Sequence, residues 1–427
     1  MCGINLAYCR ENIEKMNEAI AFRGIRSTVT ELNSDFFLGH VRLPIQGLSE
    51  EFDHPLRYKQ WTSSFVGEIF NYKDLDISAK SDLPVLTTCW DLYGKECFDE
   101  FDGFWSAVFF NHRSKLVHVF TDYLAKKPLY YRESPLGISS NIKPLTLAGG
   151  VTPDPIYHSA VKKWGYCPDN NTPYIEIKKI PPAYHLVLDP RLGKIVFQEY
   201  YTKLQPKTHA PLRILMEEAV RNRTVSDIPI SVLMSGGLDS TIIYYLLREY
   251  CPELQIFHIE NQEEDYLNYI NFRSGDKITK LSIDQDNLDL KTIFEYNEGP
   301  VDLGSVIPQY LLGKAIKDQG FNICISGDGA DELFGGYKRA MEYDSQASDI
   351  FHELVYYHLP RLDKLMMAHT VELRCPFLAR PIIEYALALP WEQRKGKNHL
   401  KGTFDSMVPR EIRDRVKKPL RWRIENG

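Results

Sequence analysis

The second residue of the chain, Cys2, is the first candidate for chemistry. It follows Met1 directly, so removal of Met1 would leave Cys2 as the terminal residue. Its thiol would then share a carbon atom with a free α-amine, whose pKa of about 7.7–8.0 suits a base near neutral pH. A nucleophile and its base would thus lie in one residue. The alternative interpretation is a buried cysteine without a chemical role.

A glycine-rich turn at residues 235–240, Ser-Gly-Gly-Leu-Asp-Ser, predicts a nucleotide site. It lies between an expected strand, 230–233, and an expected helix, 241–250. Glycines let the backbone approach an anion closely, and a helix N-terminus donates hydrogen bonds to phosphate. The loop lacks a Walker A lysine, so a P-loop kinase or GTPase is not expected. The alternative is a turn capped by serines. The predicted nucleotide-binding residues here are Ser235, Gly236, Gly237, Asp239 and Ser240, with Asp239 also placed to hold Mg²⁺.

A second acidic turn, Ser-Gly-Asp-Gly-Ala-Asp-Glu at residues 326–332, follows a strand-like segment at 321–325. Asp328 and Asp331 lie in this turn, three residues apart. Ligands of parallel sheets bind at the carboxyl ends of the strands, so two such turns could hold one magnesium–nucleotide between them. The alternative is a polar turn whose aspartates cap a helix.

The elements that must position these residues differ between the two halves of the chain. Short apolar or alternating runs predict strands before residue 201, and two helices are expected at 11–22 and 84–101, the latter capped by Ser81–Asp82. This pattern predicts an α+β layered domain. The expected strands are 36–43, 63–71, 104–110, 116–121, 128–132 and 136–140.

After residue 211 the pattern becomes helix, strand, turn, helix and strand, which is typical of an α/β parallel sheet. The helix is expected at 212–223 and the last of these strands at 254–259. The polar stretch 205–211 has prolines near both ends. We therefore expect domains at residues 1–204 and 211–427.

Composition narrows the class of protein. The 427 residues are 44% hydrophobic and 25% charged, and the net charge of −6 argues against a nucleic-acid surface. No apolar run reaches the ~20 residues of a membrane helix, and no signal segment is seen. The eight cysteines show no zinc spacing, which fits a reducing cytoplasm. Short lysine pairs are expected to be solvated or site-specific: Lys126–Lys127, Lys162–Lys163 and Lys417–Lys418.

The order of these motifs along nearly the whole chain resembles glutamine-dependent asparagine synthetases. The resemblance implies an N-terminal-nucleophile (αββα) class II glutamine amidotransferase domain. It further implies an ATP-pyrophosphatase domain of the adenine nucleotide α hydrolase-like type. The matching segments are residues 1–4, 39–45, 67–71, 81–82, 128–131, 235–240, 326–337, 372–378 and 397–401.

For the first domain, the resemblance implies glutamine hydrolysis. Cys2 would attack the side-chain amide, release ammonia and form a γ-glutamyl thioester. Arg42 would hold the α-carboxylate of glutamine, Glu68 and Asp82 its α-ammonium, and the Gly67 N–H part of the oxyanion. The alternative for the three charged residues is weak surface ion pairing.

For the second domain, the resemblance implies that ATP and a carboxylate give an acyl-adenylate and pyrophosphate, and that ammonia then forms an amide. Asp239 and Asp331 would carry Mg²⁺, Asp328 would serve the adenylate step, and Lys397 would meet the charge on departing pyrophosphate. Lys397 could otherwise be read as a solvated lysine. Further nucleotide contacts are implied for Leu233, Ile259, Ser326 and Gly327. A dry path between the sites would keep ammonia neutral.

The chain departs from this family at several positions. Val66 stands where an oxyanion-hole asparagine is usual, and losing one such donor costs about 10²–10³ in rate. Ile25–Arg26 replaces Pro-Asp, and Thr121–Asp122 replaces Arg-Asp. The chain also ends soon after Lys418. We therefore expect a weakened glutaminase beside a better-kept synthetase.

Three functions follow in order of preference. The first is a glutamine-dependent ligase that converts aspartate to asparagine with ATP and Mg²⁺. The second keeps adenylation but uses another acceptor or free ammonia. The third is a non-catalytic nucleotide-binding protein. The partners expected are small molecules, namely glutamine, ATP and a carboxylate, and no nucleic acid or membrane. The resemblance suggests a homodimer.

Overall fold

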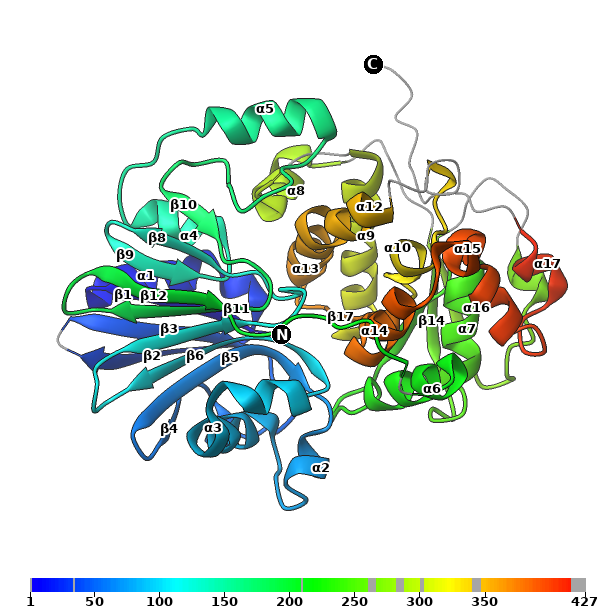
Figure 1. Cartoon of the computed structure of the whole chain (residues 1–427), viewed down its shortest axis with the longest axis horizontal. Coiled ribbons are helices and arrows are strands. Elements are labelled where there is room, and N and C mark those ends of the chain that lie inside the picture. Colours follow the sequence, from blue (N-terminus) through cyan, green and yellow to red (C-terminus); the bar gives the residue numbers. More distant parts are fainter. Residues whose placement is uncertain are drawn as a thin grey trace. The chain divides into compact units, whose positions relative to one another are not determined.

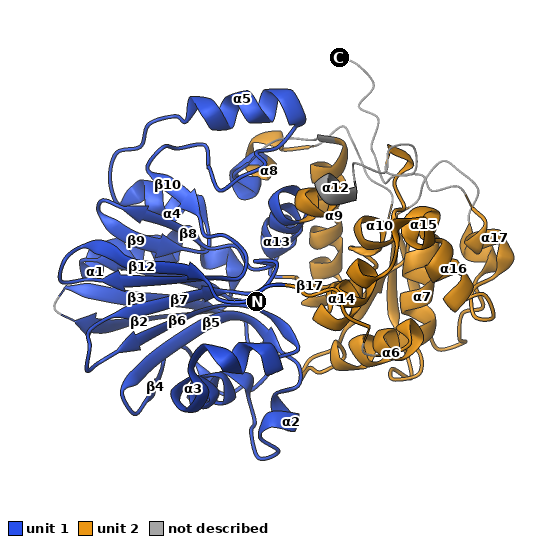
Figure 2. Ribbon diagram, viewed as in Figure 1, with its two compact units in different colours: residues 1–203, 294–302, 355–370 blue, residues 204–293, 303–354, 371–427 orange. Residues whose placement is uncertain are grey.

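The structure is a computed structural model, and its chain forms two compact units, coloured separately in Figure 2. Unit 1 comprises residues 1–203, 294–302 and 355–370, and unit 2 comprises residues 204–293, 303–354 and 371–427. Two segments from the second half of the chain therefore pack within unit 1. The structure describes residues 2–33, 35–208, 210–259, 266–281, 288–299, 303–339 and 347–415. Lys417 and Lys418 lie outside these ranges.

Unit 1 is built on two antiparallel sheets, which Figure 1 shows stacked as layers. In order across the first sheet the strands are β10 (Ile177–Lys179), β8 (Tyr130–Glu133), β9 (Leu136–Ser139), β1 (Gly3–Tyr8), β3 (Phe36–Arg42) and β2 (Arg26–Asn33). In order across the second they are β12 (Lys194–Tyr200), β11 (Tyr184–Asp189), β7 (Val117–Thr121), β6 (Gly103–Asn111), β5 (Trp61–Ile69) and β4 (Leu56–Tyr58).

Helices cover the outer faces of the two sheets of unit 1. Helix α1 packs on β1 and β3, α3 packs on β5, and β1 contacts β5. Buried Ile13 and Met16 lie one turn apart on α1 and join an apolar cluster with Phe37, because residues three or four apart share a helix face. The layers are therefore αββα, as predicted. The helices are α1 (Arg10–Ala19), α2 (Tyr72–Leu75), α3 (Asp82–Tyr93), α4 (Ile142–Leu147), α5 (Pro155–Trp164) and α13 (Leu359–Met367).

The six strands expected before residue 201 are all present, but the helix expected at 84–101 is shorter than predicted. Helix α3 ends at Tyr93, because Gly94 adopts a left-handed φ of 60°, and a 3₁₀ segment continues from Gly94 to Glu100. Ser81 occupies the N-cap position, yet its hydroxyl donates to the Asp82 carboxylate at 3.3 Å and caps no helix N–H.

Unit 2 is built on a five-stranded parallel sheet, as predicted. In order its strands are β15 (Lys277–Leu281), β14 (Gln255–Ile259), β13 (Ser231–Leu233), β16 (Ile323–Ile325) and β17 (Glu372–Arg374). Because β13 and β16 are paired and parallel, the two acidic turns that follow them start at the same edge.

The helices of unit 2 include two that begin directly at these turns, α7 and α10. Helix α6 packs on α7, and α14 packs on α6 and α10. The helices are α6 (Leu212–Asn222), α7 (Leu238–Leu247), α8 (Leu290–Asn297), whose last turn belongs to unit 1, α9 (Leu303–Asp318), α10 (Ala330–Phe334), α12 (Ala347–Glu353), α14 (Arg380–Ala388), α15 (Trp391–Arg394), α16 (Asn398–Thr403) and α17 (Arg410–Arg413).

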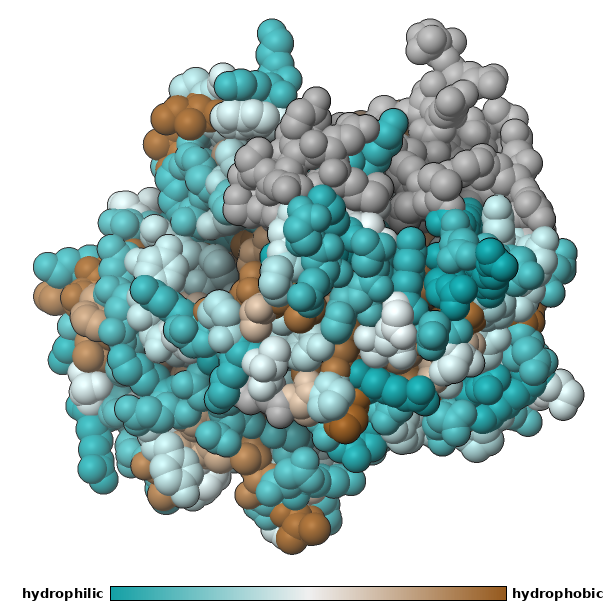
Figure 3. All heavy atoms as spheres, turned by 45° about the vertical axis from the view of Figure 1, so that its right-hand side comes forward, coloured by the Kyte–Doolittle hydropathy of each residue, from teal (hydrophilic) through white to brown (hydrophobic). Residues whose placement is uncertain are grey.

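The surface drawn in Figure 3 is mainly hydrophilic, and its apolar patches are small and separate. None of the helices within the described residues is long and apolar enough to cross a membrane.

Candidate active site

Cys2 lies just before β1 and is 8% exposed. Burial raises the pKa of its thiol, while the backbone N–H of Leu43 and the charge of Arg42 act in the opposite direction. The negative charge of Glu68 raises the pKa of the thiol further. A buried thiol needs a nearby base to become a nucleophile.

The backbone of Cys2 is held by Arg23, a residue that sequence reasoning missed. Arg23 is fully buried, and its Nε donates to the Cys2 carbonyl oxygen at 3.0 Å. Its Nη1 donates to Asn141 Oδ1 at 3.1 Å, and its Nη2 donates to Asp363 Oδ2 at 2.8 Å. Lys127 Nζ contacts the other oxygen of Asp363, also at 2.8 Å. A buried chain of charges therefore anchors the backbone of Cys2.

This chain of charges contradicts the solvated alternative of one sequence expectation. The sequence predicts that Lys126 and Lys127 are solvated or site-specific, but both are buried, and Lys127 forms an ion pair. Burial would raise the pKa of Asp363, but Arg23 and Lys127 outweigh it and lower that pKa to about 2. No sequence spacing could have revealed the contact, because Arg23 and Asp363 are 340 positions apart.

Arg42 is buried at the end of β3, so the alternative of surface ion pairing is wrong for it. Its Nη1 donates to Asp53 Oδ1 at 2.6 Å and to the Ser49 carbonyl at 3.2 Å. Its Nη2 donates to the carbonyl oxygens of Gln46 at 2.9 Å and Gly47 at 2.6 Å. The guanidinium thus holds the loop after β3. Its contact with glutamine stays a prediction.

Glu68 and Asp82 are also buried rather than on the surface. Glu68 Oε2 accepts a hydrogen bond from Gln46 Nε2 at 2.6 Å, and Asp82 Oδ2 accepts one from the Ile69 N–H at 3.1 Å. Glu68 and Ile69 are the last two residues of β5, so both carboxylates lie at the end of this strand. Their role toward an ammonium group stays a prediction, to which the structure adds Gln46 as a neighbour.

Gly67 can only be glycine in this fold. Its φ is +135°, and a Cβ atom there would lie 1.9 Å from the carbonyl oxygen of Phe104 on the neighbouring strand β6. The preceding residue, Val66, is 1% exposed and pairs with Ser106. Valine supplies no side-chain donor, so of the two expected oxyanion donors the chain keeps only the backbone N–H.

The other positions at which the first half differs from the family, Ile25–Arg26 and Thr121–Asp122, include both exposed and buried residues. Ile25 is exposed, whereas Arg26 Nη1 donates to Asp53 Oδ1 at 3.0 Å. Asp122 is buried and accepts the Trp105 N–H at 3.0 Å, and burial raises the pKa of its carboxyl. Asp122 is thus a structural acceptor in a turn of unit 1.

In unit 2, the motif at residues 235–240 follows β13 as predicted. Helix α7, however, begins earlier than expected, at Leu238, so Asp239 and Ser240 lie in its first turn. The two serines of the motif close it, since their Oγ atoms are 3.0 Å apart. Ser235 N–H donates to Ser240 Oγ at 3.2 Å, and Gly237 N–H donates to Ser235 Oγ at 3.3 Å. Gly236 has a φ of +69°, and its carbonyl accepts from Arg415 Nη1 at 3.1 Å. Arg415 is a neighbour that sequence reasoning left without a role.

Lys397 brings the two acidic turns together. Its Nζ lies 2.7 and 2.5 Å from the carboxylate oxygens of Asp239 and 2.6 Å from Asp331 Oδ1. Lys397 is 5% exposed, so its interpretation as a solvated lysine is wrong. A Cβ atom at Gly336 would lie 1.9 Å from Asp331 Oδ1, which explains the glycine after α10. Three residues predicted from separate motifs therefore meet at one point.

The second turn packs directly against the first. A Cβ atom on Gly327 would approach Asp239 Cβ to 2.9 Å. Ser326 Oγ donates to Asp328 Oδ2 at 2.6 Å. Glu332 is buried, and burial raises its pKa to about 7, with the charge of Asp331 acting in the same direction. Leu233 and Ile259 end the neighbouring strands β13 and β14, where the sequence predicts a nucleotide contact.

The chemistry of this cluster fits a magnesium ion. No group of three or more metal-binding side chains occurs among the described residues. Mg²⁺, however, is commonly held by one or two carboxylates together with substrate phosphates. Asp239 and Asp331 supply two carboxylates that converge on one cation, Lys397 Nζ. These two carboxylates therefore suit Mg²⁺, and Lys397 contacts the same two groups.

The chain matches two family profiles. The profile described as asparagine synthase matches residues 211–354 and 344–426. The profile described as glutamine amidotransferase domain matches residues 1–201. The matched stretches meet where sequence analysis expects the domain boundary, which stays a prediction.

Curated relatives resemble the chain at low identity. Asparagine synthetase B [glutamine-hydrolyzing] of Escherichia coli is 24% identical over 96% of this chain and 78% of its own length. Asparagine synthetase [glutamine-hydrolyzing] 1 of Bacillus subtilis is 26% identical over 77% of this chain and 56% of its own. Among solved structures, a glutamine phosphoribosylpyrophosphate amidotransferase from B. subtilis covers 82% of this chain and 79% of its own, with 10% identity and a TM-score of 0.36.

Proposed function

Because the chain belongs to the asparagine synthase family, we propose that it is a glutamine-dependent, ATP-dependent ligase that converts aspartate to asparagine. The observation that carries this proposal is the meeting of Asp239, Asp331 and Lys397 beside the loop at 235–240. A phosphate-binding loop, two carboxylates and a buried ammonium are what phosphoryl chemistry needs, since it depends on positioning and on neutralising charge.

In the proposed synthetase reaction, a carboxylate oxygen of the acceptor attacks the α-phosphorus of ATP, and pyrophosphate leaves. The helix N-terminus of α7 and the serines of the loop would orient the phosphates. Mg²⁺, when bound to Asp239 and Asp331, would neutralise phosphate charge. Lys397 would stabilise the negative charge that develops on the departing pyrophosphate. Ammonia then attacks the acyl carbon, and AMP leaves as the amide forms.

Asp328 is the proposed acidic residue of the adenylate step. Ser326 Oγ holds one of its oxygens at 2.6 Å, which fixes the direction of the carboxylate. Ser326 and Gly327 would flank the adenylate, and the backbone at Leu233 and Ile259 would meet the nucleoside.

In the proposed glutaminase reaction, the α-amine of Cys2 takes the thiol proton, and the thiolate attacks the amide carbon of glutamine. The same proton passes to the departing nitrogen, so that ammonia leaves and a γ-glutamyl thioester forms. Water then hydrolyses the thioester to glutamate and restores the thiol. The anchoring of the Cys2 carbonyl by Arg23 would hold the nucleophile in position. Gly67 N–H would stabilise the oxyanion. Arg42, Glu68 and Asp82 would bind the α-carboxylate and α-ammonium groups of glutamine.

The test is an assay of pyrophosphate and asparagine with ATP, Mg²⁺ and aspartate, run with glutamine and, separately, with an ammonium salt. Asparagine formed from glutamine would support the full proposal. Pyrophosphate release with a different carboxylate, but none with aspartate, would replace the acceptor. ATP binding without pyrophosphate release from any acceptor would favour a non-catalytic nucleotide-binding protein and refute the ligase proposal.

Val66 favours a second candidate, a ligase that uses free ammonia. A buried valine takes the place of the usual oxyanion donor, which reduces the stabilisation of the tetrahedral intermediate. Turnover with ammonium and none with glutamine would support this candidate over the first.

A further inference from the structure

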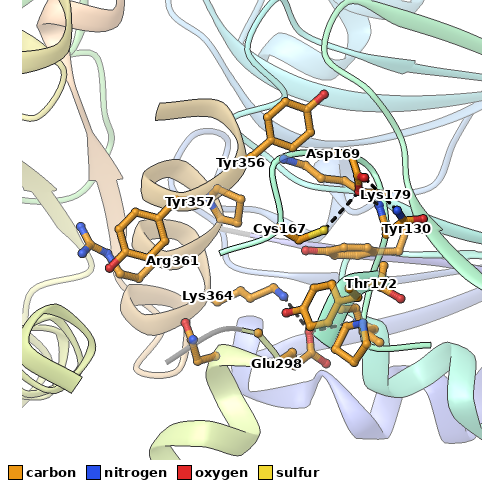
Figure 4. Close-up of a pocket in the computed structure, with 17 residues that line it drawn as sticks. Tyr130, Cys167, Asp169, Thr172, Lys179, Glu298, Tyr356, Tyr357, Arg361 and Lys364 are labelled. Carbon is orange, nitrogen blue, oxygen red and sulfur yellow. Dashed lines mark hydrogen bonds and ion pairs between the residues drawn. The ribbon is translucent and has the colours of Figure 1, made fainter. Parts of the chain in front are cut away.

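A pocket in unit 1 is lined by none of the residues assigned to the glutaminase or the synthetase. Figure 4 shows it between the edge strand β10, helix α13 and the segment at 297–299, all within unit 1. Its volume is about 530 Å³ when the open solvent at its mouth is included. Asp169 lines it and is exposed, so the pocket opens to water.

The first notable side chain in this pocket is Lys179 at the end of β10. It is 5% exposed, and its Nζ donates to the Val355 carbonyl at 2.8 Å and lies 4.9 Å from the centre of the Tyr356 ring. Among the described residues, no carboxylate lies within 4.0 Å of this ammonium. Burial, together with the charge of Lys364, lowers the pKa of Lys179 to about 7.

The second ammonium, Lys364 on α13, is also buried, at 3% exposed, and its Nζ lies 3.3 Å from Glu298 Oε2. Glu298 is already occupied, because it accepts hydrogen bonds from Asn141 Nδ2 and the Ile142 N–H, both at 2.9 Å, and from the Lys143 N–H at 2.7 Å. Glu298, which also accepts from these three donors, therefore pairs with Lys364, and Lys179 forms no ion pair with it within the described residues.

Other charges near the pocket leave this imbalance in place. Asp169 Oδ1 accepts from the Asn171 N–H at 2.7 Å and from Cys167 Sγ at 3.2 Å, and its carboxylate is exposed to water, which screens it. Arg361 also lines the pocket, with its guanidinium carbon 5.2 Å from the Tyr357 ring centre. In Figure 4 this guanidinium points away from Lys179 and Lys364, so the two lysines form the cationic centre.

We propose that this pocket binds a small oxyanion, a carboxylate or a phosphate, between Lys179 and Lys364. A buried ammonium without a counterion is costly, and an oxyanion would supply the missing charge and accept charge-assisted hydrogen bonds from both lysines. The hydroxyls of Tyr130 and Tyr157, whose side chains also line the pocket, are further donors. The proposal is independent of the reaction proposed above.

The test is isothermal titration calorimetry of the full chain with sodium succinate and, in a separate experiment, with sodium phosphate. These two probes distinguish a carboxylate site from a phosphate site. The decisive variant is Lys179→Met, which keeps the length of the side chain and removes its charge. We expect the affinity of the bound anion to fall about 10- to 100-fold, as is typical for losing a hydrogen bond between charged groups.

Two matched variants show whether the charge of Lys179 itself is responsible for binding. Lys179→Arg keeps the charge and should retain affinity within about tenfold, whereas Lys162→Met removes an exposed lysine of α5 outside the pocket and should change nothing. Circular dichroism and the thermal midpoint report whether each variant folds, and Lys364→Met provides a second loss of charge if Lys179→Met does not fold. The proposal is overturned if the wild type binds neither anion with a dissociation constant below about 10 mM. It is also overturned if Lys179→Met and Lys364→Met both bind as tightly as the wild type.

Discussion

Buried charges are neutralised in different ways around Cys2 and around Lys397. Around Cys2, each buried arginine is bonded to several neighbours. Arg23 binds Asp363, which is far along the chain, and Arg42 binds the nearby loop at 46–53. Around Lys397, two short acidic turns at adjacent strand ends face one ammonium. The first arrangement fixes a backbone, whereas the second concentrates charge where phosphates would lie.

This difference indicates which substitutions should affect the proposed glutaminase and which the proposed synthetase. The cluster of Asp239, Asp331 and Lys397 depends on a few residues in short motifs. Gly327 and Gly336 must be glycines there, because a Cβ atom would collide with Asp239 or Asp331. The Cys2 region depends on many contacts, and those of Arg23 and Arg42 are present although Ile25 and Val66 differ from the family pattern. Its scaffold is therefore intact even though Val66 supplies no side-chain donor. The proposed glutaminase and synthetase should accordingly respond to different substitutions.

The largest effect is expected from Cys2→Ala. It should abolish asparagine formation from glutamine, because the nucleophile is lost, and leave the ammonium-dependent rate within about twofold of the wild type. Both rates are measured as asparagine formed per enzyme. Cys89→Ala, at a half-buried cysteine of α3, is the control and should change neither rate. Loss of the ammonium-dependent rate in Cys2→Ala would contradict the separation of the two functions.

The next largest effect is expected from Lys397→Met. It removes the ammonium between Asp239 and Asp331, and we expect pyrophosphate release to fall by about 10²–10³. Glutamate release from glutamine should persist, because no residue of the Cys2 region changes. Lys314→Met, at an exposed lysine of α9, is the matched control. Pyrophosphate release within about tenfold of the wild type would remove Lys397 from the proposed mechanism.

A smaller effect, in the opposite direction, is expected from Val66→Asn. It restores a side-chain donor beside Gly67, and we expect glutamate release to rise about tenfold or more, up to the ~10²–10³ that one oxyanion donor provides. Val66→Ala, which adds no donor, should show no such rise. Equal rates for the wild type and Val66→Asn would show that another group already serves as the donor.

The smallest effect concerns stability. The folded pKa of Asp363, about 2, lies below its value in the unfolded chain, about 3.9. Its stabilisation is therefore fully present above pH ~4 and is lost as the pH falls toward ~2. Asp363→Asn should destabilise unit 1 by about 2–3 kcal/mol at pH 7 and by progressively less below pH ~4.

Thermal unfolding at several pH values measures this difference, and Asp74→Asn, at an exposed residue of α2, is the control. A gap between the wild type and Asp363→Asn that stays the same from pH 7 to pH 2.5 (a span that crosses the usual aspartate pKa of ~3.9) would show that the charge of Asp363 is not what stabilises the fold.

The sequence by itself determined the layered first half, the parallel sheet of the second, and the position of both acidic turns. Local pattern suffices for these features, because periodicity sets the strands and a glycine-rich turn between a strand and a helix has few structural alternatives. The meeting of Asp239 and Asp331 could also be anticipated, since parallel strands end at a common edge.

Only the tertiary structure decided which charges are buried and with whom they pair. It placed Asp363 against Arg23 and Lys127, buried Lys126 and Lys127, packed residues 355–370 within unit 1, and left Lys179 facing a pocket without a carboxylate within ion-pair distance among the described residues. These pairings join residues up to 340 positions apart. Sequence patterns report the neighbours along a helix or strand, whereas the energy of a buried charge depends on neighbours in space.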